Sequence, residues 1–201
     1  MKIFTIGHSN HQIEQFIFLL QLHQVTAIAD VRSIPYSRYN QQYNQKNLQN
    51  KLKQNKIAYS FLGDELGARS KNPNCYVKNQ AIYEKIAQTE EFLKGLTRLI
   101  KGTNKHNIAL MCAEKDPINC HRAILISRYL SKQNITILHI LSNGQLESQN
   151  QLEKRLLDLL GLNTPKQLNL FDFSQENSQS EDDLIEDAYH IQGTKIAYLR
   201  K

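Results

Sequence analysis

Two thiols, an imidazole, a guanidinium and a carboxylate fall within one segment of this 201-residue chain, MCAEKDPINCHR at positions 111–122. Its chemically active side chains are Cys112, Glu114, Cys120, His121 and Arg122. The apolar run 107–111 leads into the segment, and apolar residues at helical spacing follow it at 123–130. This pattern predicts a strand, a loop rich in reactive groups and then a helix. Loops at strand ends are where α/β proteins bind ligands.

Arginine is unusual at the predicted start of this helix. Asp116 and Pro117 indicate a turn, and Asn119 is the expected N-cap. The positive end of the helix dipole disfavours a nearby cation, so Arg122 favours a bound phosphate or carboxylate, or a fixed partner such as Glu114. The unpaired N–H groups of the same turn also attract anions. We therefore expect an anion-binding site here.

The thiols allow more than one chemistry. Cys120 is a candidate nucleophile because a helix N-terminus lowers the pKa of a thiol, and Cys112 is a second candidate. Cysteine is also a common small core residue. The two thiols with His121 and His8 form a candidate zinc site, but seven residues separate the cysteines, and adjacent side chains at a helix start diverge. We expect no cofactor and keep zinc as the weaker alternative.

Strand-like and helix-like stretches alternate through residues 1–161. This order predicts an α/β fold, Rossmann-like and three-layered, with a mostly parallel sheet and helices on both faces. The expected strands are 3–7, 26–31, 57–62, 108–112 and 135–140, and the expected helices are 13–22, 46–54, 81–100, 120–130 and 152–160.

Polar residues follow the predicted strands, and parallel strands would bring these residues to one edge of the sheet. They are His8 and Ser9 after the first strand, Asp30 and Arg32 after the second, Arg69 beyond the third, and Cys112 and Glu114 after the fourth. Ser9 also has capping-box spacing to Gln12, so it is an expected helix cap. Asp30 and Arg32 share a strand face, as a structural ion pair or a substrate-binding pair.

The loop 34–43 interleaves tyrosines with arginine, notably at Tyr36 and Arg38. Rings beside a cation suit splayed or single-stranded bases, although tyrosines that pack on the domain would explain the pattern equally well. The charge is also uneven, because residues 1–150 hold 19 Lys and Arg against 10 Asp and Glu. A basic body is compatible with a polyanionic partner.

The sequence also bears on location. Apolar runs stay well below transmembrane length, and the first residues lack a signal-peptide pattern. Three cysteines favour free thiols over a disulfide framework. We therefore expect a cytoplasmic protein without membrane association.

Four ordered motifs make a family resemblance specific. They are Thr5-Ile6-Gly7-His8-Ser9, Asp30-Val31-Arg32-Ser33-Ile34-Pro35-Tyr36-Ser37, Leu62-Gly63-Asp64-Glu65-Leu66-Gly67-Ala68-Arg69, and Met111 to Pro117 with Cys120-His121-Arg122. Over residues 2–145 the chain resembles the domain-of-unknown-function family 488. Ala68 departs from the glycine expected there. The resemblance implies an α/β fold and no established reaction.

Residues 162–187 form a predicted linker with a mobile, acidic tract, and residues 188–201 form a candidate hairpin. Within the linker a short peptide resembles the bacterial sliding-clamp binding motif, in which glutamine, leucine and a Leu-Phe pair enter an apolar pocket of the clamp. The matching residues are Gln167, Leu168, Leu170 and Phe171. The bacterial DNA sliding clamp is therefore an expected partner.

These features predict a DNA- or nucleotide-processing protein of replication or repair, recruited by the clamp, whose reaction type stays open. The expected catalytic residues are His8, Asp30, Cys112, Glu114, Cys120 and His121, and the expected anion- or substrate-binding residues are Ser9, Arg32, Tyr36, Arg38, Arg69 and Arg122. One alternative is a non-catalytic nucleic-acid-binding adaptor. Another is a thiol-dependent sulfurtransferase-like enzyme.

Overall fold

The computed structural model describes residues 1–163 and 180–200. One six-stranded sheet has the order β3-β2-β6-β1-β7-β8. Its strands are β1 (Lys2–Gly7), β2 (Ala27–Asp30), β3 (Ala58–Phe61), β6 (Ile108–Cys112), β7 (Thr136–Ile140) and β8 (Leu146–Ser148). The first five are parallel to one another, and β8 pairs antiparallel with β7. The predicted α/β class with a mostly parallel sheet is confirmed.

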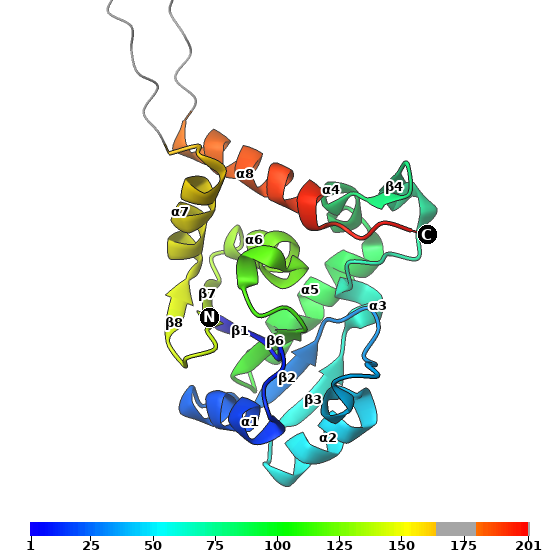
Figure 1. Ribbon diagram of the computed structural model, residues 1–201, viewed down its shortest axis with the longest axis vertical. Coiled ribbons are helices and arrows are strands. Elements are labelled where there is room, and N and C mark those ends of the chain that lie inside the picture. Colours follow the sequence, from blue (N-terminus) through cyan, green and yellow to red (C-terminus); the bar gives the residue numbers. More distant parts are fainter. Residues whose placement is uncertain (164–179, 201) are drawn as a thin grey trace, which may run out of the picture.

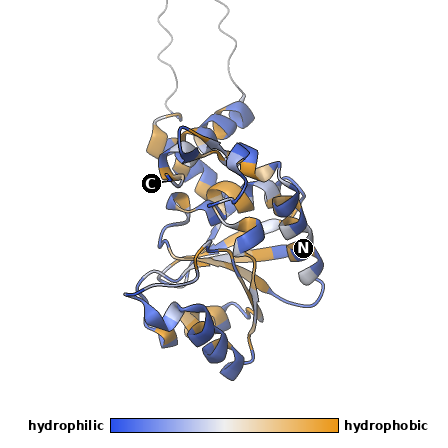
Figure 2. Ribbon diagram, turned by 90° about the vertical axis from the view of Figure 1, so that its right-hand side faces the viewer, coloured by the Kyte–Doolittle hydropathy of each residue, from blue (hydrophilic) through white to orange (hydrophobic). Residues whose placement is uncertain are grey.

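Helices cover both faces of the sheet (Figure 1). They are α1 (Ile13–Leu22), α2 (Gln45–Gln54), α3 (Gly63–Leu66), α4 (Tyr83–Ala87), α5 (Glu90–Gly102), α6 (Arg128–Ser131), α7 (Gln149–Leu160) and α8 (Glu181–Ile196). Helices α1 and α2 pack on one face through an apolar cluster that includes Phe16 and Leu48. Helices α5, α7 and α8 belong to the cluster on the other face, with Phe92, Leu156 and Tyr189. Figure 2 shows hydrophobic residues concentrated on the strands and hydrophilic residues on the outer helix surfaces.

Side-chain alternation in β6 directs residues to the two faces. Ala109 and Met111 join the α1–α2 cluster, whereas Leu110 and Cys112 join the cluster on the opposite face. Asp30 of β2 is the register partner of Met111, so it shares the face of Met111 and not that of Cys112. Alternation therefore separates two of the predicted site residues at the same end of the sheet.

The C-terminal part differs from its prediction. Residues 181–196 form α8, where the sequence indicated an acidic mobile tract to 187 and then a hairpin. Ser180 begins the helix with a capping box to Asp183, and Ala188 and Tyr189 are buried against the domain. The hairpin prediction was wrong because capping and burial of one helical face outweigh the Gly193-Thr194 turn signal.

The chain after α8 is extended and pairs with a small hairpin, β4 (Tyr76–Val77) and β5 (Gln80–Ala81). The Ala81 N–H donates to the Tyr198 carbonyl at 2.9 Å, and the Arg200 N–H donates to the Asn79 carbonyl at 2.8 Å. These bonds bring the C-terminus to the sheet end that carries the candidate site.

Other boundaries moved slightly. The predicted helix 81–100 is two helices, because Thr89 caps α5 with its side chain. Gly161 ends α7 in a left-handed conformation, as its position predicted. No helix among the described residues is long and apolar enough to cross a membrane. The predicted clamp peptide, residues 167–171, lies outside the described residues.

Candidate functional site

A cavity of about 270 Å³ opens at the carboxyl ends of β2 and β6. It collects residues from the loops after β2, α3 and β6, from α4 and from the C-terminal segment. The lining residues are Arg32, Ser33, Ile34, Ala68, Arg69, Tyr83, Cys112, Ala113, Glu114, Asn119, Cys120, His121, Ile196 and Tyr198. Six of the predicted site residues are therefore brought together here, and the rest are not.

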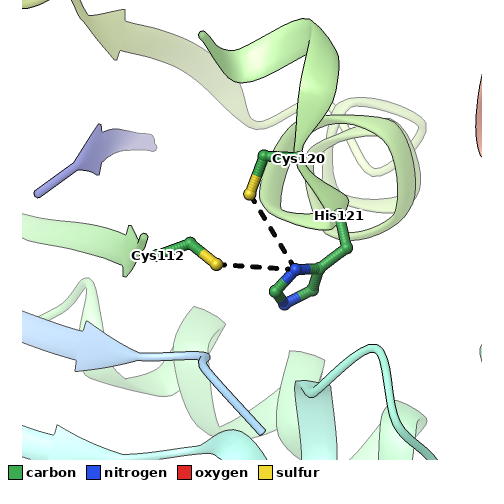
Figure 3. A group of neighbouring side chains, drawn as sticks. All are labelled: Cys112, Cys120 and His121. Carbon is green, nitrogen blue, oxygen red and sulfur yellow. Dashed lines mark hydrogen bonds between the residues drawn. The ribbon is translucent and has the colours of Figure 1, made fainter. Parts of the chain in front are cut away.

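Two thiols and an imidazole of the cavity lining lie close together, and Figure 3 shows both sulfur atoms beside one nitrogen of the ring. The Sγ atom of Cys112 lies 3.6 Å from Nδ1 of His121, and the Sγ atom of Cys120 lies 3.9 Å from the same nitrogen. All three side chains are buried, and their ligand atoms lie within 4.8 Å of one another. We refer to Cys112, Cys120 and His121 as the thiol–imidazole cluster.

The other ring nitrogen of His121 fixes the tautomer. Nε2 lies 3.0 Å from the backbone carbonyl oxygen of Val31. A carbonyl oxygen can only accept, so Nε2 carries the proton and donates it. In the neutral ring Nδ1 then presents a lone pair toward the two sulfur atoms.

Glu114 extends the cluster toward solvent. The Cys120 thiol donates to Oε2 of Glu114 at 3.0 Å. Burial, with the neighbouring Cys120, raises the pKa of Glu114. Burial also raises the pKa of Cys112. For Cys120, burial acts in the same direction, but the hydrogen bond with Cys112 and the positive charge of Arg122 outweigh it and hold the pKa well below its usual value.

Local backbone geometry explains how the side chains of the adjacent residues Cys120 and His121 come together in the cluster. Asp116 caps the 3₁₀ turn Pro117–Asn119, accepting from the Ile118 N–H at 3.0 Å, and Cys120 is extended with φ −139° and ψ 137°. The following segment, Arg122–Ser127, is π-helical. Asn119 is therefore not the N-cap that the sequence indicated. The expected divergence of Cys120 and His121 was also wrong, because Cys120 precedes the helix.

Arg122 does not face the cavity. Its side chain is fully buried, and its guanidinium donates to the backbone carbonyls of Glu114 at 2.8 Å and Lys115 at 3.2 Å. A Cβ at Gly7 would overlap the Glu114 carbonyl oxygen, so glycine lets β1 approach this loop. The structure therefore gives Arg122 a role in holding the loop and corrects its predicted role as a phosphate ligand.

A second polar cluster lies on the α1–α2 side of the sheet. Arg32 binds Asp30 through two nitrogens, at 2.9 and 2.6 Å, and donates to the Tyr43 carbonyl at 2.8 Å. The Tyr59 hydroxyl donates to Asp30 at 2.8 Å. The geometry is that of the buried structural ion pair, one of the two alternatives for Asp30 and Arg32.

His8 joins this second cluster. Its Nδ1 donates to the Ser9 carbonyl at 2.8 Å, Arg32 donates to its Nε2 at 3.4 Å, and its ring stacks on Tyr43. Burial lowers the pKa of His8 to about 4. His8 and Asp30 are thus neighbours of the same arginine, but neither lines the cavity.

The remaining predicted residues have different positions. Ser9 does not cap α1, because Gln12 occupies the N-cap position and Ser9 donates to the Asn10 side chain. Tyr36 and Arg38 are exposed and do not line the cavity. Arg69 does line it, with its guanidinium 4.3 Å from the centre of the Tyr198 ring.

Sequence reasoning missed two aromatic residues of the cavity wall, Tyr83 and Tyr198. Tyr198 follows Cys112 and Cys120 by more than 75 residues in the sequence. It reaches the cavity only because the C-terminal segment pairs with β5. Nothing in the local sequence around it signals that contact.

The fold and the cavity define a three-layer α/β protein with a cavity rich in ionisable side chains at the carboxyl end of a mostly parallel sheet. Residues 12–129 match the family model described as Domain of unknown function DUF488, and because this range is more than half of the chain, the protein belongs to that family. The first resembling motif, residues 5–9, precedes the matched range. No curated protein and no solved structure matches the chain.

Proposed function

We propose that the protein is an enzyme that processes DNA or nucleotides at the cavity, with Glu114 as its acid or base. The observation that carries this proposal is the joint presence of a carboxylate, two thiols and a cation around one cavity at the carboxyl ends of the strands. This is the position at which open α/β sheets bind their substrates.

Arg69 is the residue best suited to bind a phosphate. Its guanidinium contacts the Tyr198 ring, and no carboxylate among the described residues pairs with it. The guanidinium groups of Arg32 and Arg122, in contrast, are occupied by partners within the protein. An arginine held against a ring can bind phosphate on its free edge. The same ring offers a surface on which a base can stack.

The loop after β2 supports a nucleic-acid substrate. Ile34 lines the cavity, and beyond it Tyr36 and Tyr39 are 65% and 95% exposed. Both rings are largely exposed, whereas Tyr43 at the end of the same loop is buried against the domain, so the packing explanation applies to Tyr43. With Arg38 between them, they offer the combination of rings and cation that single-stranded nucleic acids bind.

The test is turnover. The full-length protein is incubated with deoxynucleotides, single-stranded DNA and nicked duplex DNA, and products are followed by mass spectrometry. We expect product formation that falls by about 100-fold or more in Glu114→Gln, the effect of losing an acid or base. Glu91→Gln, an exposed carboxylate on α5, serves as the matched control and keeps full activity.

Two results oppose the proposal. Equal turnover by Glu114→Gln and wild type rejects the role of Glu114. Tight DNA binding without any product favours the non-catalytic adaptor instead.

Recruitment by the bacterial DNA sliding clamp is part of the same proposal and is supported by the peptide at residues 167–171. We expect Phe171→Ala to abolish binding to the clamp of the source organism, because the motif inserts this ring into an apolar pocket. Phe173→Ala, two residues beyond the motif, is the control and binds normally. Unchanged affinity of Phe171→Ala rejects recruitment by this peptide.

A second candidate function is sulfur transfer, favoured by the 3.0 Å contact between Cys120 Sγ and Glu114. Here the Cys120 thiolate attacks the outer sulfur of thiosulfate, a cysteine persulfide forms and sulfite leaves. Mass spectrometry after incubation with thiosulfate would show one added sulfur on Cys120, absent in Cys120→Ser. A wild-type protein that gains no sulfur rejects this candidate.

A further inference from the structure

The thiol–imidazole cluster has the geometry of a metal centre. A tetrahedral zinc ion with Zn–S near 2.3 Å and Zn–N near 2.1 Å places its sulfur and nitrogen ligands about 3.6 Å apart. The two sulfur-to-Nδ1 distances here are 3.6 and 3.9 Å. Three ligand atoms, from the end of β6 and from the adjacent Cys120 and His121, therefore already lie within 4.8 Å of one another (Figure 3).

The hydrogen bonds around the cluster are those expected of metal ligands. His121 donates Nε2–H to the Val31 carbonyl, which leaves Nδ1 free to coordinate, and metal-bound histidines are usually oriented in this way. The backbone N–H of Arg122 donates to the Cys120 sulfur at 3.4 Å, which stabilises negative charge on that atom. Thiolate and imidazole ligands together favour zinc among the common divalent ions.

We propose that Cys112, Cys120 and His121 bind a zinc ion whose fourth position opens into the cavity, where it holds a water molecule beside Glu114. Three protein ligands with an open fourth position are typical of catalytic zinc sites, whereas structural sites are closed by four. All three ligands line the cavity, as does Glu114. This inference rests on the proposed function because it names the centre of the same cavity.

Glu114 is the base in this arrangement. It accepts a proton from the water, the water oxygen bonds to an electrophilic centre of the substrate, and the bond to the leaving group breaks. Glu114 then returns the proton to the leaving group, so that water and substrate give two products with no redox change. Nucleobase deaminases use the same set, three Cys or His ligands with a Glu that is not itself a ligand.

This assignment changes the role of the thiols. Cys112 and Cys120 are ligands, so the nucleophile is water and not a cysteine. It also narrows the substrate to a nucleotide or nucleic acid with a hydrolysable group, and Arg69 lies in the same cavity to hold its phosphate.

The test measures metal content and coordination in the full-length protein. After purification in zinc-containing buffer without chelator, we expect about one zinc ion per chain by elemental analysis. Cys112→Ser, Cys120→Ser and His121→Gln should each lose most of the metal, with folding checked by circular dichroism. Cys75→Ser is the matched control, because Cys75 is also buried and free but lies in the turn before β4.

A second readout does not depend on any variant folding. Cobalt(II) added to metal-free wild type should give the visible absorption of a tetrahedral ion and thiolate-to-metal charge transfer. Zinc content well below one ion per chain together with no such spectrum overturns the inference. A disulfide between Cys112 and Cys120 in the protein purified under reducing conditions overturns it as well.

The two proposals fail in different ways. A protein that binds zinc but converts no nucleotide or DNA retains the metal site and rejects the proposed function. A protein that converts such substrates at full rate when free of metal retains the proposed function and rejects the catalytic metal site. Glu114→Gln should keep its zinc and lose turnover, which separates the base from the ligands.

Discussion

Two polar clusters at the same end of the sheet contrast sharply. The closed cluster, on the α1–α2 face, consists of His8, Asp30, Arg32, Tyr43 and Tyr59. The open cluster, on the other face, consists of Cys112, Glu114, Cys120 and His121. In the closed cluster both carboxylate oxygens of Asp30 and both ring nitrogens of His8 have partners within the protein.

The open cluster is different because all of its members line the cavity, whereas Arg32 alone of the closed cluster does so. The lone pair of His121 Nδ1 points at two sulfurs, which are weak donors, and Glu114 reaches solvent. Both clusters are rich in the residue types that catalyse reactions. The contrast teaches that such residues indicate a site only where some of their bonding capacity is left for a ligand.

The largest expected effect comes from a substitution that breaks the closed cluster. Asp30→Ala leaves Arg32 buried without its charge partner and removes the acceptor of Tyr59, so we expect a loss of about 3–5 kcal/mol in the free energy of unfolding. Urea denaturation measures it. The fraction that remains folded should bind zinc normally, because Asp30 lies on the opposite face of the sheet. A loss below about 1 kcal/mol would contradict the structural role.

A second prediction concerns His139, a buried histidine of β7. Both nitrogens of His139 are bonded, to Thr5 at 2.8 Å and Gln149 at 3.0 Å, and burial lowers its pKa to about 3. The unfolded chain takes up a proton near pH 6.5, so this contribution to stability is complete above pH 6.5 and lost as the pH falls toward 3. Between pH 7 and 4.5 the loss is about 2–3 kcal/mol.

The matched variant is His139→Gln, measured by urea denaturation at both pH values. It should be less stable than wild type at pH 7, and its stability should change by about 2 kcal/mol less over the same pH interval. Equal pH dependence in the two proteins would show that His139 is not held neutral.

The smallest expected effect comes from a substitution that removes one hydrogen bond from the closed cluster. Tyr59→Phe takes away the donor to Asp30, and we expect a loss of about 1–2 kcal/mol because Asp30 is charged. Tyr39→Phe, at a ring that is 95% exposed, should change the unfolding midpoint by little. If both substitutions have the same effect, the Tyr59 hydroxyl does not contribute to the cluster.

Sequence reasoning located elements well where local patterns are strong. The predicted helix 13–22 and strand 108–112 coincide with α1 and β6. It located them poorly where burial decides the secondary structure. Residues 181–196 have a weak local pattern, but they form a helix because one face of it packs on the domain. The roles of Ser9 and Asn119 as caps failed for a related reason, since both loops are held by contacts from elsewhere.

The sequence by itself determined the family, the order of strands and helices along the chain, and the place of reactive residues at strand ends. These follow from the periodicity of neighbouring residues and from short motifs. Only the tertiary structure decided which of those residues share a cavity. The register that pairs Asp30 with Met111 sends Asp30 and Cys112 to opposite faces, and burial turns Arg122 into a support for the loop. Contacts of this kind depend on distant parts of the chain, and no local pattern encodes them.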